Sequence, residues 1–165
     1  MDRILVVDDE FIIRDLMRTV LEEEGFSVIT ASDGDEALQK ADNELPDLIL
    51  LDLMMPGKNG LEVCRLLKSQ AKTKHIPVIM STVLGREVDR AMTKEAGADA
   101  HLTKPFSALA LLTEVGRQLE SSRTISPKEP LSSNNIVINF HVEQQRIAPV
   151  RTKHNLNHLS EPVIT

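Results

Sequence analysis

The chain has 165 residues, a formal net charge of −6 at pH 7 and 41% hydrophobic residues, enough for one domain of ordinary size with some chain left over. Its acidic balance argues against a general binder of nucleic acid or of anionic membranes. It has no basic, apolar leader and no run of roughly 18 apolar residues, and its single cysteine, Cys64, fits a reducing compartment. We therefore expect a cytoplasmic protein without membrane contact.

Short apolar runs recur through the first 120 residues and predict strands. They are ILVV (4–7), FSVIT (26–30), LILL (48–51), PVIMS (77–81) and AHLT (100–103). Segments with helical periodicity follow each run and predict helices over 11–24, 34–43, 60–70, 86–96 and 106–120. Strands that alternate with helices favour an α/β fold in which a parallel sheet is covered on both faces.

Polar side chains stand where four of the predicted strands end. Asp8 and Asp9 follow the first strand, Asp52 the third, Thr82 the fourth and Lys104 the fifth. Ligands of open parallel sheets bind at the carboxyl ends of the strands, so we expect these groups to form one site. Asp52 is the most telling of them, because it closes a run of four aliphatic residues.

Clustered carboxylates repel one another unless a cation lies between them, and oxygen ligands suit Mg²⁺, with Mn²⁺ as an alternative. A metal, an ammonium and a hydroxyl around one carboxylate would bind a phosphoryl group, and Asp52 could be its nucleophilic acceptor. Each residue also has an ordinary interpretation by itself. Asp8 and Asp9 could cap the first helix, Thr82 could be a turn hydroxyl, and Lys104 could be a solvated lysine.

Residues 1 to about 120 resemble the receiver domain of two-component response regulators. The resemblance rests on ILVVDDE (4–10), DLILLDLMMPGKNGLEVCRLLK (47–68), IPVIMST (76–82) and GADAHLTKPF (97–106), in this order and spacing. It implies a doubly wound, flavodoxin-like, five-stranded parallel sheet with strand order 2-1-3-4-5 and five helices. It also implies that Asp52 accepts a phosphoryl group from a histidine kinase or a phosphotransfer protein.

By the same resemblance, Asp9, Asp52 and the backbone carbonyl of Met54 would hold Mg²⁺, with Asp8 acting through water. Thr82 and Lys104 would contact the phosphoryl oxygens, and the bond before Pro105 would be cis. The switch position of the family is occupied by His101, either an ordinary strand histidine or an imidazole that swings inward when Thr82 moves. The last helix carries a core stripe of Leu111, Val115 and Leu119, and two leucines off the stripe, Leu109 and Leu112.

The charge and composition change near Glu120. Residues 1–120 hold 14 Lys+Arg and 22 Asp+Glu, whereas residues 121–165 hold 5 and 3 and begin with a polar, Ser-rich stretch. We therefore place a domain boundary there, followed by a linker and tail with little regular structure. The alternating run 135–142 predicts one strand, either paired or disordered, and the tail shows no recognisable effector domain.

These patterns predict a response regulator that acts in a phosphorelay or as a protein-binding switch, as a monomer or a phosphorylation-dependent dimer. Its downstream partner would contact the fourth helix, the fifth strand and the fifth helix. Direct binding of nucleic acid is not expected, and the chain would catalyse only the phosphorylation of Asp52 and its hydrolysis. One alternative is a transcriptional regulator whose DNA-binding effector is missing. The other is a phosphatase with Asp52 as nucleophile, which Met54 disfavours because such enzymes place an acid at that position.

Overall fold

The structure, a computed structural model, describes residues 1–83 and 87–125. Strands and helices alternate through this part of the chain. They are β1 (Arg3–Val7), α1 (Phe11–Glu23), β2 (Ser27–Ala31), α2 (Gly34–Glu44), β3 (Leu48–Asp52), α3 (Gly60–Ser69), β4 (Val78–Thr82), α4 (Glu87–Glu95), β5 (Ala100–Thr103) and α5 (Ala108–Ile125). The predicted strand at 135–142 lies outside the described residues.

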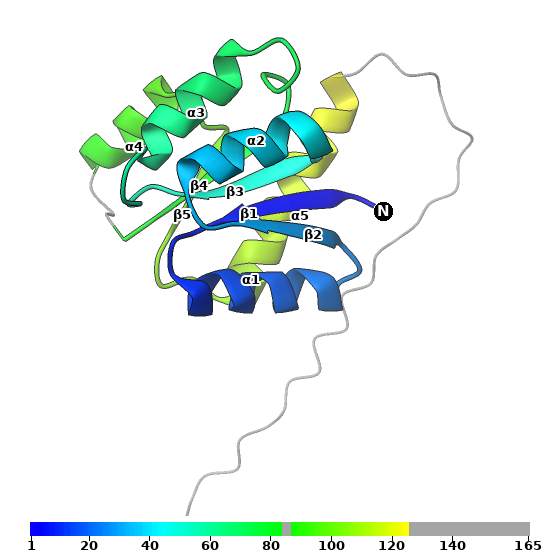
Figure 1. The fold of residues 1–165 in the computed structure, drawn as a ribbon. Helices are drawn as coiled ribbons and strands as arrows, with labels where there is room; N and C mark the ends of the chain where they lie inside the picture. The colour runs from blue at the N-terminus through cyan, green and yellow to red at the C-terminus, as the bar shows by residue number, and fades with distance from the viewer. Residues whose placement is uncertain (84–86, 126–165) are drawn as a thin grey trace, which may run out of the picture. The chain divides into compact units, whose positions relative to one another are not determined.

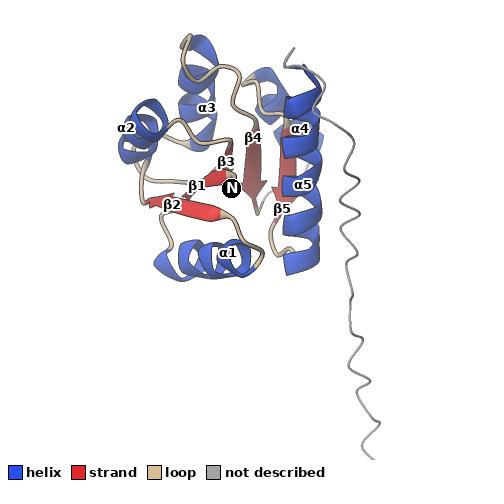
Figure 2. Ribbon diagram, turned by 90° about the vertical axis from the view of Figure 1, so that its right-hand side faces the viewer, coloured by secondary structure: helices blue, strands red, loops and turns tan. Residues whose placement is uncertain are grey.

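The five strands form one parallel sheet in the order β2-β1-β3-β4-β5, which confirms the predicted fold. Figures 1 and 2 show α1 on one side of this sheet and α2 and α3 on the other. Because both faces are covered, the central strands β3 and β4 are buried along their whole length. This explains why their sequences are continuous apolar runs rather than alternating ones.

Two apolar clusters, one on each face of the sheet, hold the helices in place. The first joins alternate strand residues to Met17 and Leu21 of α1 and to the predicted stripe Leu111, Val115 and Leu119 of α5. The second joins the other strand residues to α2 and α3 and includes Cys64, which is fully buried as a packing residue. Leu109 is exposed, whereas Leu112 packs against the first cluster and is only half-buried.

The last helix is displaced from its predicted span at both ends. It begins at Ala108 rather than at 106, because the hydroxyl of Ser107 accepts a hydrogen bond from the amide of Ala110 at 3.1 Å. It continues to Ile125, five residues beyond the predicted end, and Arg123 in its last turn pairs with Asp2 at 2.7 Å. No helix among the described residues is long and apolar enough to cross a membrane.

Candidate functional site

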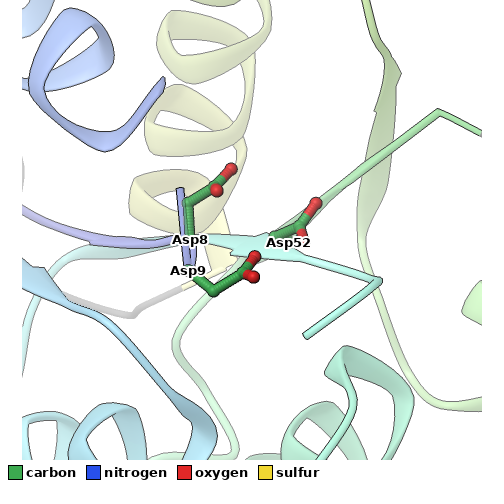
Figure 3. Close-up of side chains that lie close together, drawn as sticks. All are labelled: Asp8, Asp9 and Asp52. Carbon is green, nitrogen blue, oxygen red and sulfur yellow. The ribbon is translucent and has the colours of Figure 1, made fainter. Parts of the chain in front are cut away.

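Three carboxylates meet at the carboxyl edge of the sheet. Asp8 and Asp9 follow β1, Asp52 ends the neighbouring strand β3, and one oxygen from each lies within 4.8 Å of the others. Figure 3 shows the three side chains gathered at the ends of the two strands. Asp8 is fully buried and Asp52 is 4% exposed, whereas Asp9 is exposed. The convergence expected from the sequence is thus present, with one member of the cluster open to solvent.

Lys104 supplies the cation of this cluster. Its Nζ lies 2.6 Å from Oδ2 of Asp8 and 2.9 Å from Oδ1 of Asp52. Its backbone amide donates to the carbonyl of Thr82 at 2.7 Å, and its peptide bond to Pro105 is cis, the isomer that the family resemblance implies. Lys104 is therefore not the solvated lysine of the alternative interpretation, because its ammonium binds two buried carboxylates.

The backbone around Asp8 fixes its carboxylate. Oδ1 of Asp8 accepts a hydrogen bond from the amide of Glu10 at 2.9 Å, and Nη1 of Arg14 donates to the Asp8 carbonyl at 2.6 Å. The N-cap of α1 is Glu10, and no side chain caps this helix end. Asp8 and Asp9 are therefore not helix caps, and both carboxylates remain available to the cluster.

The segment after Asp52 is held by close backbone packing. The amide of Leu53 donates to the carbonyl of Ser81 at 2.9 Å, and the amide of Gly60 donates to the carbonyl of Leu53 at 2.9 Å. A Cβ at position 60 would lie 2.3 Å from the carbonyl oxygen of Asp52 and 2.8 Å from Cα of Leu53. Glycine is required at position 60 because the start of α3 packs directly on the backbone of the predicted acceptor.

Burial and charge oppose each other at Asp52. Burial raises the pKa of Asp52, and the neighbouring charges of Asp8 and Asp9 add to this effect, while Lys104 lowers it through its hydrogen bond and charge; the pKa is raised on balance. For Lys104, burial lowers the pKa, but its bonds to Asp8 and Asp52 outweigh burial and leave the pKa raised. The ammonium stays charged, and the Asp52 carboxylate is held in an environment that disfavours its own charge.

Thr82 and His101 lie on the neighbouring strands β4 and β5. Thr82 ends β4 and is 2% exposed, and its partner in register on β5 is Thr103. His101 pairs in register with Met80, two residues before Thr82, so alternation places His101 and Thr82 on the same face of the sheet. His101 is half-buried. Burial raises the pKa of Glu114 on α5, but Arg117 is the main partner that lowers it, and the charge of His101 adds to this lowering, so that the pKa is lowered on balance.

Exposed apolar residues, here called the rim, stand in the segments that follow β1, β3 and β4, and the sequence interpretation missed most of them. Phe11, Ile12 and Leu16 are exposed on the outer side of α1, which begins directly after the acids. Met54 and Val83, in the segments that follow β3 and β4, are also exposed. Leu16 lies at helical spacing with the apolar stripe of α1, yet it faces solvent, because the burial of this helix centres on Met17 and Leu21. Phe11 and Ile12 could have been found by their place outside that stripe.

The donor set fits a hard divalent cation. Three carboxylates offer one oxygen each at mutual distances that a single ion can bridge, and oxygen-only ligands select Mg²⁺ or Mn²⁺ over softer metals. The single ammonium of Lys104 already binds both Asp8 and Asp52, whereas Asp9 stays exposed to solvent. A metal would therefore approach through Asp9.

Comparison with known proteins identifies the family. Residues 4–116 match the family model of the response regulator receiver domain. The chain belongs to this family. Among solved structures, the chemotaxis response regulator CheY4 of Vibrio cholerae superposes with a TM-score of 0.69 at 35% identity, covering 71% of this chain and 98% of that one. The likeness therefore spans the whole sheet and its helices.

Two of the most similar relatives are phosphate regulon transcriptional regulatory proteins PhoB. The Klebsiella pneumoniae protein is 46% identical over 76% of this chain and 53% of its own length. The Escherichia coli protein is 38% identical over 98% of this chain and 66% of its own length. The chain thus spans between half and two thirds of these relatives, and the second match runs well beyond the receiver domain model.

Proposed function

We propose that Asp52 accepts a phosphoryl group from a phosphohistidine of a sensor histidine kinase or a phosphotransfer protein. The observation that carries this proposal is the setting of Asp52, a buried carboxylate that is grouped with Asp8 and Asp9 at the carboxyl edge of the sheet and pairs with Lys104. Buried carboxylates of this kind are costly for a fold, and they are kept where chemistry needs them. Membership of the receiver family agrees with this role.

In the proposed step, one carboxylate oxygen of Asp52 attacks phosphorus and forms an O–P bond. The P–N bond of the phosphohistidine breaks, and its electron pair stays on the imidazole nitrogen of the donor. Lys104 moves its ammonium toward the phosphoryl oxygens, and the Thr82 hydroxyl donates to one of them. A divalent ion held by Asp9, Asp52 and the Met54 carbonyl, with Asp8 through water, would neutralise charge on the same oxygens.

The exposed rim of Phe11, Ile12, Leu16, Met54 and Val83 favours a protein rather than a small molecule as the physiological donor. Apolar side chains gathered around a charged site exclude water when a partner covers them. Phosphorylation would then bias the positions of Thr82 and His101, and a partner would detect the change at α4, β5 and α5.

A second candidate concerns the output of the whole protein. Several relatives are named transcriptional regulatory proteins, and the Escherichia coli match extends over 161 residues, past the end of the receiver domain model at residue 116. This favours transcriptional regulation, with DNA bound by a region beyond the receiver domain, over a chain that binds no nucleic acid. Salt-dependent binding of a full-length protein to its operator, strengthened by phosphorylation, would support it.

The proposed acceptor role is tested with acetyl phosphate and Mg²⁺, followed by intact mass measurement under native conditions. We expect one phosphoryl adduct on the wild-type chain and none on Asp52→Asn, and the same spectra report whether the adduct dimerises. An equal adduct on Asp52→Asn would contradict the assignment of the acceptor. Multiple turnover of a small phosphoester would instead support the phosphatase alternative, since the proposal limits catalysis to the chain's own acyl phosphate.

A further inference from the structure

Ser81, the fourth residue of β4, is a buried polar group to which the site gives no role so far. It is 1% exposed, and its Oγ has no hydrogen-bond partner among the residues that the structure describes. The other buried hydroxyls among the described residues have partners. The hydroxyl of Thr73, for example, donates to the carbonyl of Leu67 at 2.8 Å. An unpartnered buried hydroxyl costs stability, so its presence beside a site calls for a reason.

The sheet register places this hydroxyl beside the acceptor. Ser81 pairs in register with Asp52 on β3, and the Leu53 amide binds the Ser81 carbonyl at 2.9 Å, which fixes the two strands together at this level. Leu50 and Ile79, two residues before Asp52 and Ser81, belong to the same apolar cluster under α1 and α5. Because side chains alternate along a strand, Asp52 and Ser81 also project from one face, about 5 Å apart.

Lys104 passes close to the same position. Its Cα follows β5, yet its Nζ reaches Asp52 on β3 and Asp8 on β1, and β4 lies between β5 and β3 in the sheet. The lysine side chain therefore crosses the carboxyl end of β4. The other in-register neighbour of Ser81 is Leu102, which is apolar. The polar side chains that this arrangement brings to Ser81 are thus Asp52 and Lys104.

We propose that Ser81 is a positioning residue that donates a hydrogen bond to the Asp52 carboxyl group in the phosphorylated state. Without phosphate, Oδ1 of Asp52 is taken by the Lys104 ammonium at 2.9 Å. A phosphoryl group draws this ammonium away, and the oxygen that it leaves needs a new donor. A serine hydroxyl can supply one by rotation about χ1 alone, without movement of the backbone. This inference rests on the proposed acceptor role of Asp52.

The Ser81 hydroxyl would then contribute nothing or a cost to the stability of the free protein, but it would stabilise the phosphorylated protein. In the free protein the hydroxyl is buried without a partner, so its removal leaves stability unchanged or raises it. In the phosphorylated protein it orients the carboxyl group that carries phosphorus, so its removal weakens that state. A serine that serves only to pack the strand would show neither the second effect nor its dependence on the hydroxyl.

The test uses the full chain with Mg²⁺ and beryllium trifluoride, which binds carboxylates in the geometry of a phosphoryl group. Affinity and thermal midpoint are measured for the wild type, Ser81→Ala, Ser81→Thr and Asp52→Asn. We expect Ser81→Ala to bind the analogue about 10-fold more weakly, as the loss of one hydrogen bond to a charged group would cause. Ser81→Thr, which keeps the hydroxyl, should stay within about 3-fold of the wild type, and the midpoint of ligand-free Ser81→Ala should not fall.

Equal affinity of Ser81→Ala and the wild type would overturn the inference and leave the acceptor role intact. So would an equal loss in Ser81→Thr, because packing and not the hydroxyl would then matter. A lower midpoint of ligand-free Ser81→Ala would also overturn it, since the hydroxyl would already be bonded before phosphorylation. Absence of binding by the wild type would contradict the acceptor role itself, and the inference with it.

Discussion

The two ends of the parallel sheet handle charge in opposite ways. At the amino end, three carboxylates each pair with a cation of their own, in the pairs Asp2–Arg123, Glu44–Arg3 and Asp99–Lys68. At the carboxyl end, Asp8, Asp9 and Asp52 crowd together, and Lys104 is the cation that the described residues bring to them. The amino end is arranged for stability, whereas the carboxyl end holds three carboxylates whose mutual repulsion Lys104 relieves only in part.

The largest effect is expected from removing the cation of the carboxyl end. Lys104→Met leaves two buried carboxylates without a counter-charge, and we expect a loss of about 3 kcal/mol in the free energy of unfolding at neutral pH. The matched variant at the amino end, Arg123→Met, breaks an exposed pair and should lose less than about 1 kcal/mol. Denaturant unfolding of both variants measures the two losses in free energy of unfolding. Equal losses would contradict the proposed difference between the two ends of the sheet.

The next effect concerns the backbone behind the acceptor. Gly60→Ala would force a Cβ against the Asp52 carbonyl oxygen, and backbone cannot move aside as a flexible side chain can. We expect a loss of about 2 kcal/mol in stability, together with slower phosphorylation of Asp52. Gly116→Ala is the control, since a Cβ there meets nothing within 4 Å and alanine favours the helix. The prediction fails if both alanines are equally well tolerated in denaturant unfolding.

A smaller effect tests the charge of Asp52 itself. Its pKa is raised by burial above the ordinary value of 3.8, so ionisation costs stability once the pH exceeds that value. Asp52→Asn should therefore stabilise the free protein by about 1 kcal/mol at neutral pH, and the gain should vanish as the pH falls below about 4. Thermal unfolding between pH 3 and pH 7 provides the measurement.

Asp99→Asn is the counterpart of this substitution at the amino end. Asp99 accepts hydrogen bonds from Lys68 and from the Val78 amide, both at 2.8 Å. Its replacement should destabilise the protein by about 1 kcal/mol, opposite in sign to Asp52→Asn. Destabilisation by both substitutions would mean that Asp52 is a structural carboxylate like Asp99.

The smallest effect comes from the metal. Mg²⁺ that binds only the folded state should raise stability by about 0.4 kcal/mol when its free concentration equals its Kd, and by more above it. Asp9→Asn should abolish this gain while leaving the metal-free stability close to that of the wild type, because Asp9 is exposed. Thermal unfolding with and without Mg²⁺ measures the two stabilities, and calorimetric titration measures the affinity for Mg²⁺. An unchanged affinity in Asp9→Asn would exclude Asp9 as a ligand.

The sheet and the meeting of its charged residues could be predicted because both follow from local patterns. Each apolar run of the sequence became a strand, and parallel strands necessarily bring the residues after Val7, Leu51 and Thr103 to one edge. Asp33 directly precedes α2, as N-cap residues do, and its side chain accepts from the amide of Glu36 at 2.9 Å. These features need no knowledge of contacts between distant residues.

The remaining features depend on such contacts, which no local pattern encodes. Lys104 crosses β4 to contact Asp52 because β4 lies between β5 and β3 in the sheet. The Ser81 hydroxyl has no hydrogen-bond partner because of the side chains that the fold packs around it. The extension of α5 to Ile125 depends on Arg123 meeting Asp2, which is 121 residues away in sequence. Leu16 shows the limit of a local pattern, because a residue at helical spacing need not face the core.

The most direct measurement identifies the residue that carries phosphorus. The chain is phosphorylated with acetyl phosphate and Mg²⁺, and borohydride then reduces any acyl phosphate to homoserine, which peptide mass spectrometry locates in the sequence. We predict homoserine at position 52 alone, and none when Mg²⁺ is removed by a chelator. Homoserine at position 8 or 9, or an adduct that borohydride does not reduce, would contradict the assignment of Asp52 as the phosphoryl acceptor.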